Sequence, residues 1–121
     1  NLVAGTKTKT QILEEIKWKL DSCKETNDKF IAMFKEDPVH AFKWSHDYIK
    51  NVAIERVYKI FEDHIVKGRT MVQIRHSFVD EYTRGAKWPE NSTSPTSNLM
   101  SQCLTSAYVD ICETISEWEI E

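Results

Sequence analysis

The chain has 121 residues, of which 40% are hydrophobic, and its net charge is only −3. This much apolar content with so little net charge excludes a disordered chain, and the length fits one domain over residues 1–121. Three Gly and three Pro exclude collagen-like and Pro-rich classes, and the lack of a long apolar run predicts no membrane partner.

Residues 8–36 are predicted to form the first long helix, after a loose N-terminal stretch over 1–7. The segment Thr8–Gln11 matches a capping box. In this motif the side chain of Thr8 accepts a hydrogen bond from the backbone N–H of Gln11, and the side chain of Gln11 accepts one from the N–H of Thr8. Asp37 and Pro38 end this helix and begin the next, because Pro is tolerated in the first turn of a helix and not in its interior.

Apolar residues on this first helix recur at steps of three and four through Leu13, Ile16 and Leu20, and Asn27 lies on the same stripe. Such spacing is typical of a coiled coil, where a buried Asn pairs with its copy and sets the register. The stripe therefore predicts self-association, as a homodimer, through these four residues. The alternative is that Asn27 forms a hydrogen bond inside the core of a single bundle.

The second long helix is predicted over 38–67. One of its apolar stripes runs through Phe42, His46, Ile49, Ala53, Val57, Ile60 and His64. A second stripe, through Ile54, Tyr58, Phe61 and Ile65, indicates that this helix is covered on more than one side.

The third helix is predicted over 71–84, behind a second capping box at Thr70–Gln73. A long loop over 86–97 leads to a fourth helix over 96–119. No segment shows the period of two that predicts a strand. The predicted fold is thus an all-α four-helix bundle with two long N-terminal helices and mostly antiparallel neighbours.

Charge is unevenly distributed along the chain. Residues 88–121 contain six acidic residues and no Lys or Arg. Asp110, Glu113 and Glu117 give the fourth helix an acidic face, which argues against nucleic acid as a partner. A stretch of Lys and Arg over 67–87 leaves weak nucleic-acid binding as an alternative.

Signatures of catalysis and of metal or cofactor binding are sparse. The spacing of the four His matches no metal motif, so no cofactor and no metal are predicted. The three Cys lie on or beside apolar stripes and fit buried, reduced thiols, which favours a cytoplasmic protein.

The pair Arg69 and His76 is the one candidate for catalysis. Its spacing resembles the Arg-x4–6-His motif of small all-helical ribonucleases of the HEPN kind, which are four-helix bundles. The resemblance implies a metal-independent ribonuclease in which His76 handles the 2′-hydroxyl proton and Arg69 steadies phosphate charge. Thr70 as the helix cap leaves Arg69 outside the helix, which departs from this arrangement.

Tryptophan supplies the leading functional hypothesis. Trp18 and Trp44 fall off the main apolar stripes, and Trp88 lies in the predicted loop. Trp is enriched where protein interfaces concentrate their binding energy. The sequence therefore predicts a non-enzymatic protein–protein interaction module, such as an adaptor, inhibitor or assembly subunit. Its contact surface would comprise these three residues and the acidic face of the fourth helix.

Overall fold

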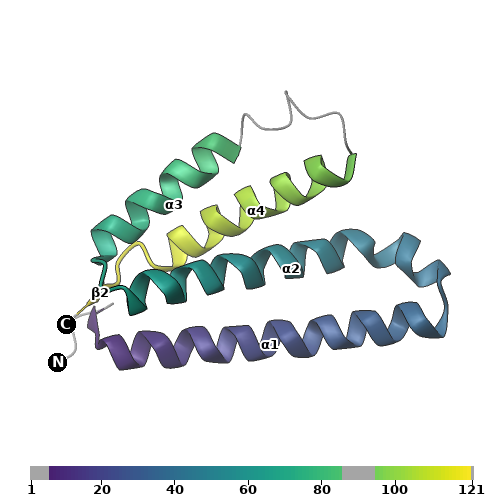
Figure 1. Cartoon of the computed structure of the whole chain (residues 1–121), viewed down its shortest axis with the longest axis horizontal. Coiled ribbons are helices and arrows are strands. Elements are labelled where there is room, and N and C mark those ends of the chain that lie inside the picture. Colours follow the sequence, from purple (N-terminus) through teal and green to yellow (C-terminus); the bar gives the residue numbers. More distant parts are fainter. Residues whose placement is uncertain (1–5, 86–94, 121) are drawn as a thin grey trace.

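The computed structural model describes residues 6–85 and 95–120, which form four helices and one pair of short strands (Figure 1). The elements are β1 (Thr6–Lys7), α1 (Lys9–Glu36), α2 (Val39–Val66), α3 (Met71–Gly85), α4 (Pro95–Thr114) and β2 (Glu119–Ile120). The predicted all-α bundle with two long N-terminal helices is confirmed. None of the helices in the described part of the chain has both the length and the apolar composition that crossing a bilayer requires.

Both predicted capping boxes are present. The backbone N–H of Thr8 donates to Oε1 of Gln11 at 2.9 Å, and the N–H of Gln11 donates to Oγ1 of Thr8 at 3.1 Å. Thr70 and Gln73 repeat this geometry at the start of α3, with the same two distances. These bonds satisfy N–H groups that lack a partner in the first turn of a helix, so local sequence sets where α1 and α3 begin.

The helices pack in an order that differs from their order in the sequence. α1 and α2 form a long antiparallel hairpin, α4 packs on the other side of α2, and α3 packs on α4 (Figure 1). α2 and α4 run in the same direction, whereas α1 with α2 and α3 with α4 run in opposite directions. α2 therefore has neighbours on two sides, which its two apolar stripes had indicated.

All four helices contribute to one hydrophobic core. The rings of Phe61 on α2 and Phe78 on α3 are both fully buried and meet edge to face, with centroids 6.0 Å apart. Tyr108 on α4 extends this cluster, since its ring centroid lies 5.4 Å from that of Phe78. On the first predicted stripe of α2, Ala53 and Val57 are fully buried, but Ile60 is 37% exposed, whereas its neighbour Phe61 on the second stripe is fully buried.

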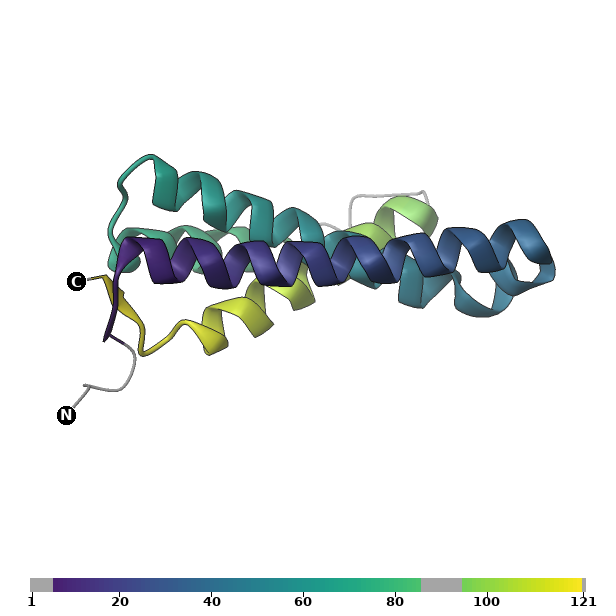
Figure 2. The same cartoon turned by 90° about the horizontal axis from the view of Figure 1, so that it is seen from below.

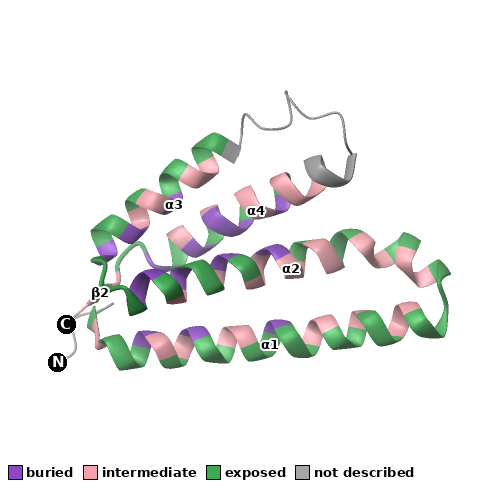
Figure 3. Cartoon of the chain, in the orientation of Figure 1, coloured by how far each residue is buried: buried purple, intermediate pink, exposed green. Residues whose placement is uncertain are grey.

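The α1–α2 hairpin extends beyond α3 and α4 at the end where the chain turns between the two long helices (Figures 1 and 2). No residue between Cys23 and Ala53 is buried, as Figure 3 shows for this end of both helices. We call residues 24–52 the hairpin tip. Phe42, which its stripe predicted to be in the core, is 90% exposed because it lies in the tip, near the end of the hairpin.

α4 ends at Thr114, five residues earlier than its predicted end at 119. The guanidinium of Arg75 on α3 donates to the carbonyl oxygens of Ile115 at 3.3 Å and Trp118 at 2.8 Å. The chain then pairs in parallel with the segment before α1, with Thr6 opposite Glu119. The sequence predicted a loose stretch through residue 7 and gave no sign of a strand, and both expectations are wrong at β1 and β2. A strand of two residues is too short to show the alternation of apolar and polar side chains by which strands are predicted. Residues 1–5 lie outside the described residues.

Candidate functional site

A groove of about 250 Å³ lies where α1, α2 and α4 meet. Its lining includes Trp18 and Lys19 from α1, Ile54 and Tyr58 from α2, and Ala107, Asp110 and Ile111 from α4. We call it the Trp18 groove. The predicted contact residues Trp18 and Asp110, 92 positions apart in the sequence, thus line the same site.

Trp18 forms an exposed apolar wall of this groove. Its side chain is 65% exposed, and the ammonium of Lys19 lies 5.1 Å from the centre of its ring. Ile54 and Tyr58, both half-buried, line the groove as well and pack against the core. Sequence reasoning did not predict Ile54 and Tyr58 as site residues. It placed them on the second apolar stripe of α2, which indicated only that another helix packs on that side.

The rim of the Trp18 groove is acidic on the side of α4. Asp110 lines the groove, and Glu113 and Glu117 follow it as exposed residues. Within the described residues, none of these three carboxylates forms an ion pair, whereas Glu119 is paired with Arg75 at 3.2 Å. Unpaired carboxylates of one sign attract a cationic partner at longer range than the apolar wall can.

The other two predicted tryptophans are not part of this groove. Trp44 is half-buried in the hairpin tip, and the ammonium of Lys43 lies 5.3 Å from its ring centre. Trp88 lies outside the described residues, as does most of the predicted 86–97 loop. The proposed contact surface therefore retains Trp18, with Asp110 and Glu113 on α4, whereas Glu117 lies beyond the end of that helix at Thr114.

The stripe that predicts self-association is occupied within the chain. Ile16 is 1% exposed in the core, and Leu13 and Leu20 are half-buried and pack against it. The side-chain amide of Asn51 on α2 donates to Oδ1 of Asn27 at 2.7 Å and to the carbonyl oxygen of Cys23 at 2.9 Å. Asn27 thus forms a hydrogen bond within the chain that links α1 to α2, although it is half-buried in the hairpin tip rather than in the core.

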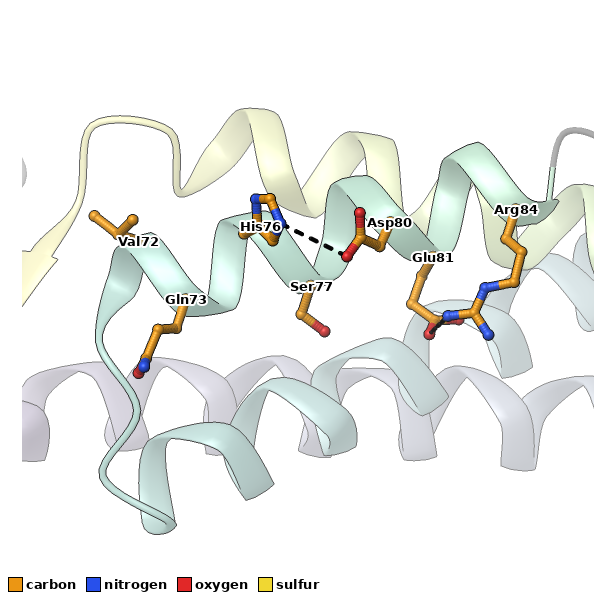
Figure 4. A pocket seen from close by; sticks show the side chains of 7 residues that line it. All are labelled: Val72, Gln73, His76, Ser77, Asp80, Glu81 and Arg84. Carbon is orange, nitrogen blue, oxygen red and sulfur yellow. Dashed lines mark hydrogen bonds and ion pairs between the residues drawn. The ribbon is translucent and has the colours of Figure 1, made fainter.

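Arg69 and His76 have different partners. His76 is exposed on α3, where Nε2 lies 3.8 Å from Asp80, and it lines a surface pocket in which all seven lining side chains come from this helix (Figure 4). Arg69 does not line that pocket, and its guanidinium donates instead to Nδ1 of His64 at the end of α2. The structure therefore does not bring the two predicted ribonuclease residues together in one pocket.

The basic stretch over 67–87 has acidic and carbonyl partners within the chain. Lys67 pairs with Asp63 at 2.8 Å, and Arg84 pairs with Glu81 at 2.7 Å. Arg75 binds the end of α4, and Lys87 lies outside the described residues. These contacts reduce the charge available to a phosphate backbone, on which nucleic-acid binding by such a stretch depends.

The thiols are poorly suited to nucleophilic chemistry. All three cysteines are free; Cys23 and Cys103 are buried and Cys112 is half-buried. Burial raises the pKa of the Cys23 thiol, and the Glu55 carboxylate raises it further. The thiol form, rather than the reactive thiolate, is therefore favoured. Within residues 6–85 and 95–120, no three His, Cys, Asp or Glu side chains lie close enough together to ligate a metal ion.

Among the residues that the structure describes, His64 is the one charged or strongly polar side chain that is buried, with 8% of its surface exposed. Burial lowers its pKa from 6.5, and the cationic Arg69 lowers it further, although Asp63 opposes them. Accepting a hydrogen bond from Arg69 at Nδ1 also requires the neutral ring. Its surroundings thus favour the neutral ring, whose centroid lies 6.0 Å from that of Phe78.

We expect acidification to destabilise the fold through His64. The folded chain disfavours the charged ring, so below pH 6.5, the ordinary pKa of His, the unfolded chain binds more protons. The contribution of His64 to the free energy of unfolding should therefore be constant above that pH and fall as the pH drops from there through the folded pKa. Urea titrations over this range should show a smaller pH dependence in His64→Asn than in the wild type. His76→Asn, at an exposed site, is the matched control and should keep the wild-type slope. Equal slopes in His64→Asn and wild type would contradict the assignment.

Comparisons of the chain with protein-family models, with curated proteins and with solved structures find no match, and the geometry of the chain's own residues is what supports a function.

Proposed function

We propose that this chain is a non-enzymatic helical module that binds another protein through the Trp18 groove. The observation that carries the proposal is the exposed Trp18, which forms the wall of a groove lined by three helices. A Trp side chain offers 150–250 Å² of surface for burial, and its exposure in the free chain leaves that stabilisation to be gained on binding. Aromatic side chains beside pockets are the usual centres of binding energy in protein interfaces.

The chemistry of the rim favours a basic partner. Asp110 lies in the groove itself, and Glu113 and Glu117 extend the acidic surface along the end of the chain. A partner segment that carries an apolar side chain flanked by Lys or Arg would bury the former against Trp18 and place the latter near these carboxylates. The free thiols fit a reducing compartment such as the cytoplasm. A module of this kind would serve as an adaptor, an inhibitor or a subunit of a larger assembly.

Calorimetric titration with a synthetic amphipathic helix of Leu and Lys tests this proposal. We expect the peptide to bind the wild type and a Leu and Glu analogue not to bind. Trp18→Ala should weaken binding by about tenfold or more, because loss of a central aromatic contact typically costs above about 1.4 kcal/mol. Asp110→Lys should also weaken binding and reduce its dependence on salt.

Val72→Ala is the matched control, because Val72 on α3 is as exposed as Trp18 but does not line the groove. This variant should bind the peptide like the wild type. Far-UV circular dichroism should be unchanged in all variants, since the altered side chains are exposed. Wild-type affinity in Trp18→Ala would refute the groove as the site, and equal binding of the two peptides would refute the preference for a basic partner.

A further inference from the structure

The hairpin tip lacks a core of its own. Three of its aromatic side chains cluster, with the ring centroid of Tyr48 on α2 lying 6.0 Å from that of Phe30 and 5.6 Å from that of Phe34 on α1. Nevertheless, no residue of the tip is buried, although all of them are described. Two helices in contact can cover only one side of each other, so side chains on the remaining faces need further helices.

The first turns of α2 hold the most exposed apolar side chains of the tip. Phe42 is 90% exposed and Val39 is 65% exposed. They are three residues apart, so they share one helix face. Phe42 also lies on the stripe whose Ala53 and Val57 are fully buried, so this face extends an apolar surface that is already used inside the bundle.

The charges of the tip distinguish between possible occupants. Residues 24–52 contain five Lys and five acidic residues, and no Arg. A second copy can therefore approach this surface without net repulsion, whereas the acidic rim of the Trp18 groove would repel its own copy. A membrane surface, by contrast, selects for an excess of basic residues, which the tip does not have.

We infer that the hairpin tip binds the hairpin tip of a second copy, forming a four-helix bundle of two α1 and two α2 segments. α4 borders the tip at His46 and Lys50, which line one pocket with Cys103 and Ser106. Each copy therefore contributes about ten residues per helix, which span about 15 Å. A face of this size gives an interface at the small end of the known range, so the dimer is reversible. In a two-fold arrangement Phe42 of each copy packs on the same surface of the other. This inference does not depend on the Trp18 groove, none of whose lining residues belongs to the tip.

Sedimentation velocity over a concentration series tests the inference directly. The wild-type mass should rise from 14.2 kDa toward twice that value with concentration. Phe42→Asp should raise the dissociation constant by about tenfold or more, because each dimer then loses two apolar contacts and gains two facing carboxylates. Phe42→Leu should restore much of the association. The substitutions should leave the circular dichroism spectrum unchanged, because Phe42 is exposed in the single chain.

Val72→Asp is the matched control, since Val72 is exposed on α3, away from the tip. It should dimerise like the wild type. A wild type that is monomeric at every concentration would overturn the inference, as would wild-type association in Phe42→Asp or equal weakening in Val72→Asp. Binding of a monomeric wild type to anionic lipid vesicles, lost in Phe42→Asp, would identify a membrane as the occupant and would also overturn it.

Discussion

Replacing Phe61 with Ala is expected to lower the free energy of unfolding by about 3–5 kcal/mol, the range found when a buried aromatic side chain is truncated. Phe61 is fully buried and its ring contacts those of Phe78 and Trp118, at centroid distances of 6.0 and 6.3 Å. The truncation would therefore open a cavity where α2, α3 and the end of the chain meet. Since domains of this kind are stable by only about 5–15 kcal/mol, the loss should be plain in urea denaturation.

Ile60→Ala is the matched control for this prediction. Ile60 is the neighbouring residue on α2 and is 37% exposed, so its truncation removes less buried surface and should cost less than about 2 kcal/mol. The contrast tests which of the two apolar stripes of α2 faces the core at this level. Equal losses for the two variants would contradict the packing described for α2.

Arg75→Ala should lower the free energy of unfolding by about 1.5–3 kcal/mol, because hydrogen bonds from a charged donor contribute in this range. The guanidinium binds the carbonyl oxygens of Ile115 and Trp118 and the carboxylate of Glu119. Those carbonyl groups follow the last turn of α4, beyond the regular hydrogen bonds of the helix. The carbonyl oxygen of Ile115 also accepts a hydrogen bond from the N–H of Trp118 at 3.0 Å, so Arg75 holds a turn that the backbone already closes. Hydrogen exchange should also become faster in β1 and β2, whose pairing depends on this turn.

Arg84→Ala provides the comparison, because Arg84 is exposed on the same helix and its partner Glu81 is only three residues away. An exposed pair of this kind contributes about 0–1 kcal/mol. If Arg84→Ala were as destabilising as Arg75→Ala, the larger role assigned to Arg75 would be wrong. If hydrogen exchange in β1 and β2 were unchanged in Arg75→Ala, the pairing of the two strands would not depend on Arg75.

The candidate site was only partly predictable from sequence. Trp18 and Asp110 were each indicated by local features, an aromatic residue off its stripe and an acidic helix face. That they line one groove depends on α4 packing beside α2, which no local pattern specifies. Trp44 lies on α2 ten residues before Ile54 and does not line the groove, and Arg69 bonds to His64, five residues before it, rather than to His76.

The sequence by itself determined the helices and their starts, because capping and apolar periodicity act between residues a few positions apart. Thr8 and Thr70 cap α1 and α3 as their sequence predicts, and Asp37 accepts a hydrogen bond from the N–H of Val39 at 3.0 Å. Only the tertiary structure decided the end of α4, the partner of Asn27 and the exposure of Phe42. Each of these depends on contact, or lack of contact, with residues distant in the sequence, and periodicity along one helix does not specify which helices cover it or how far they reach.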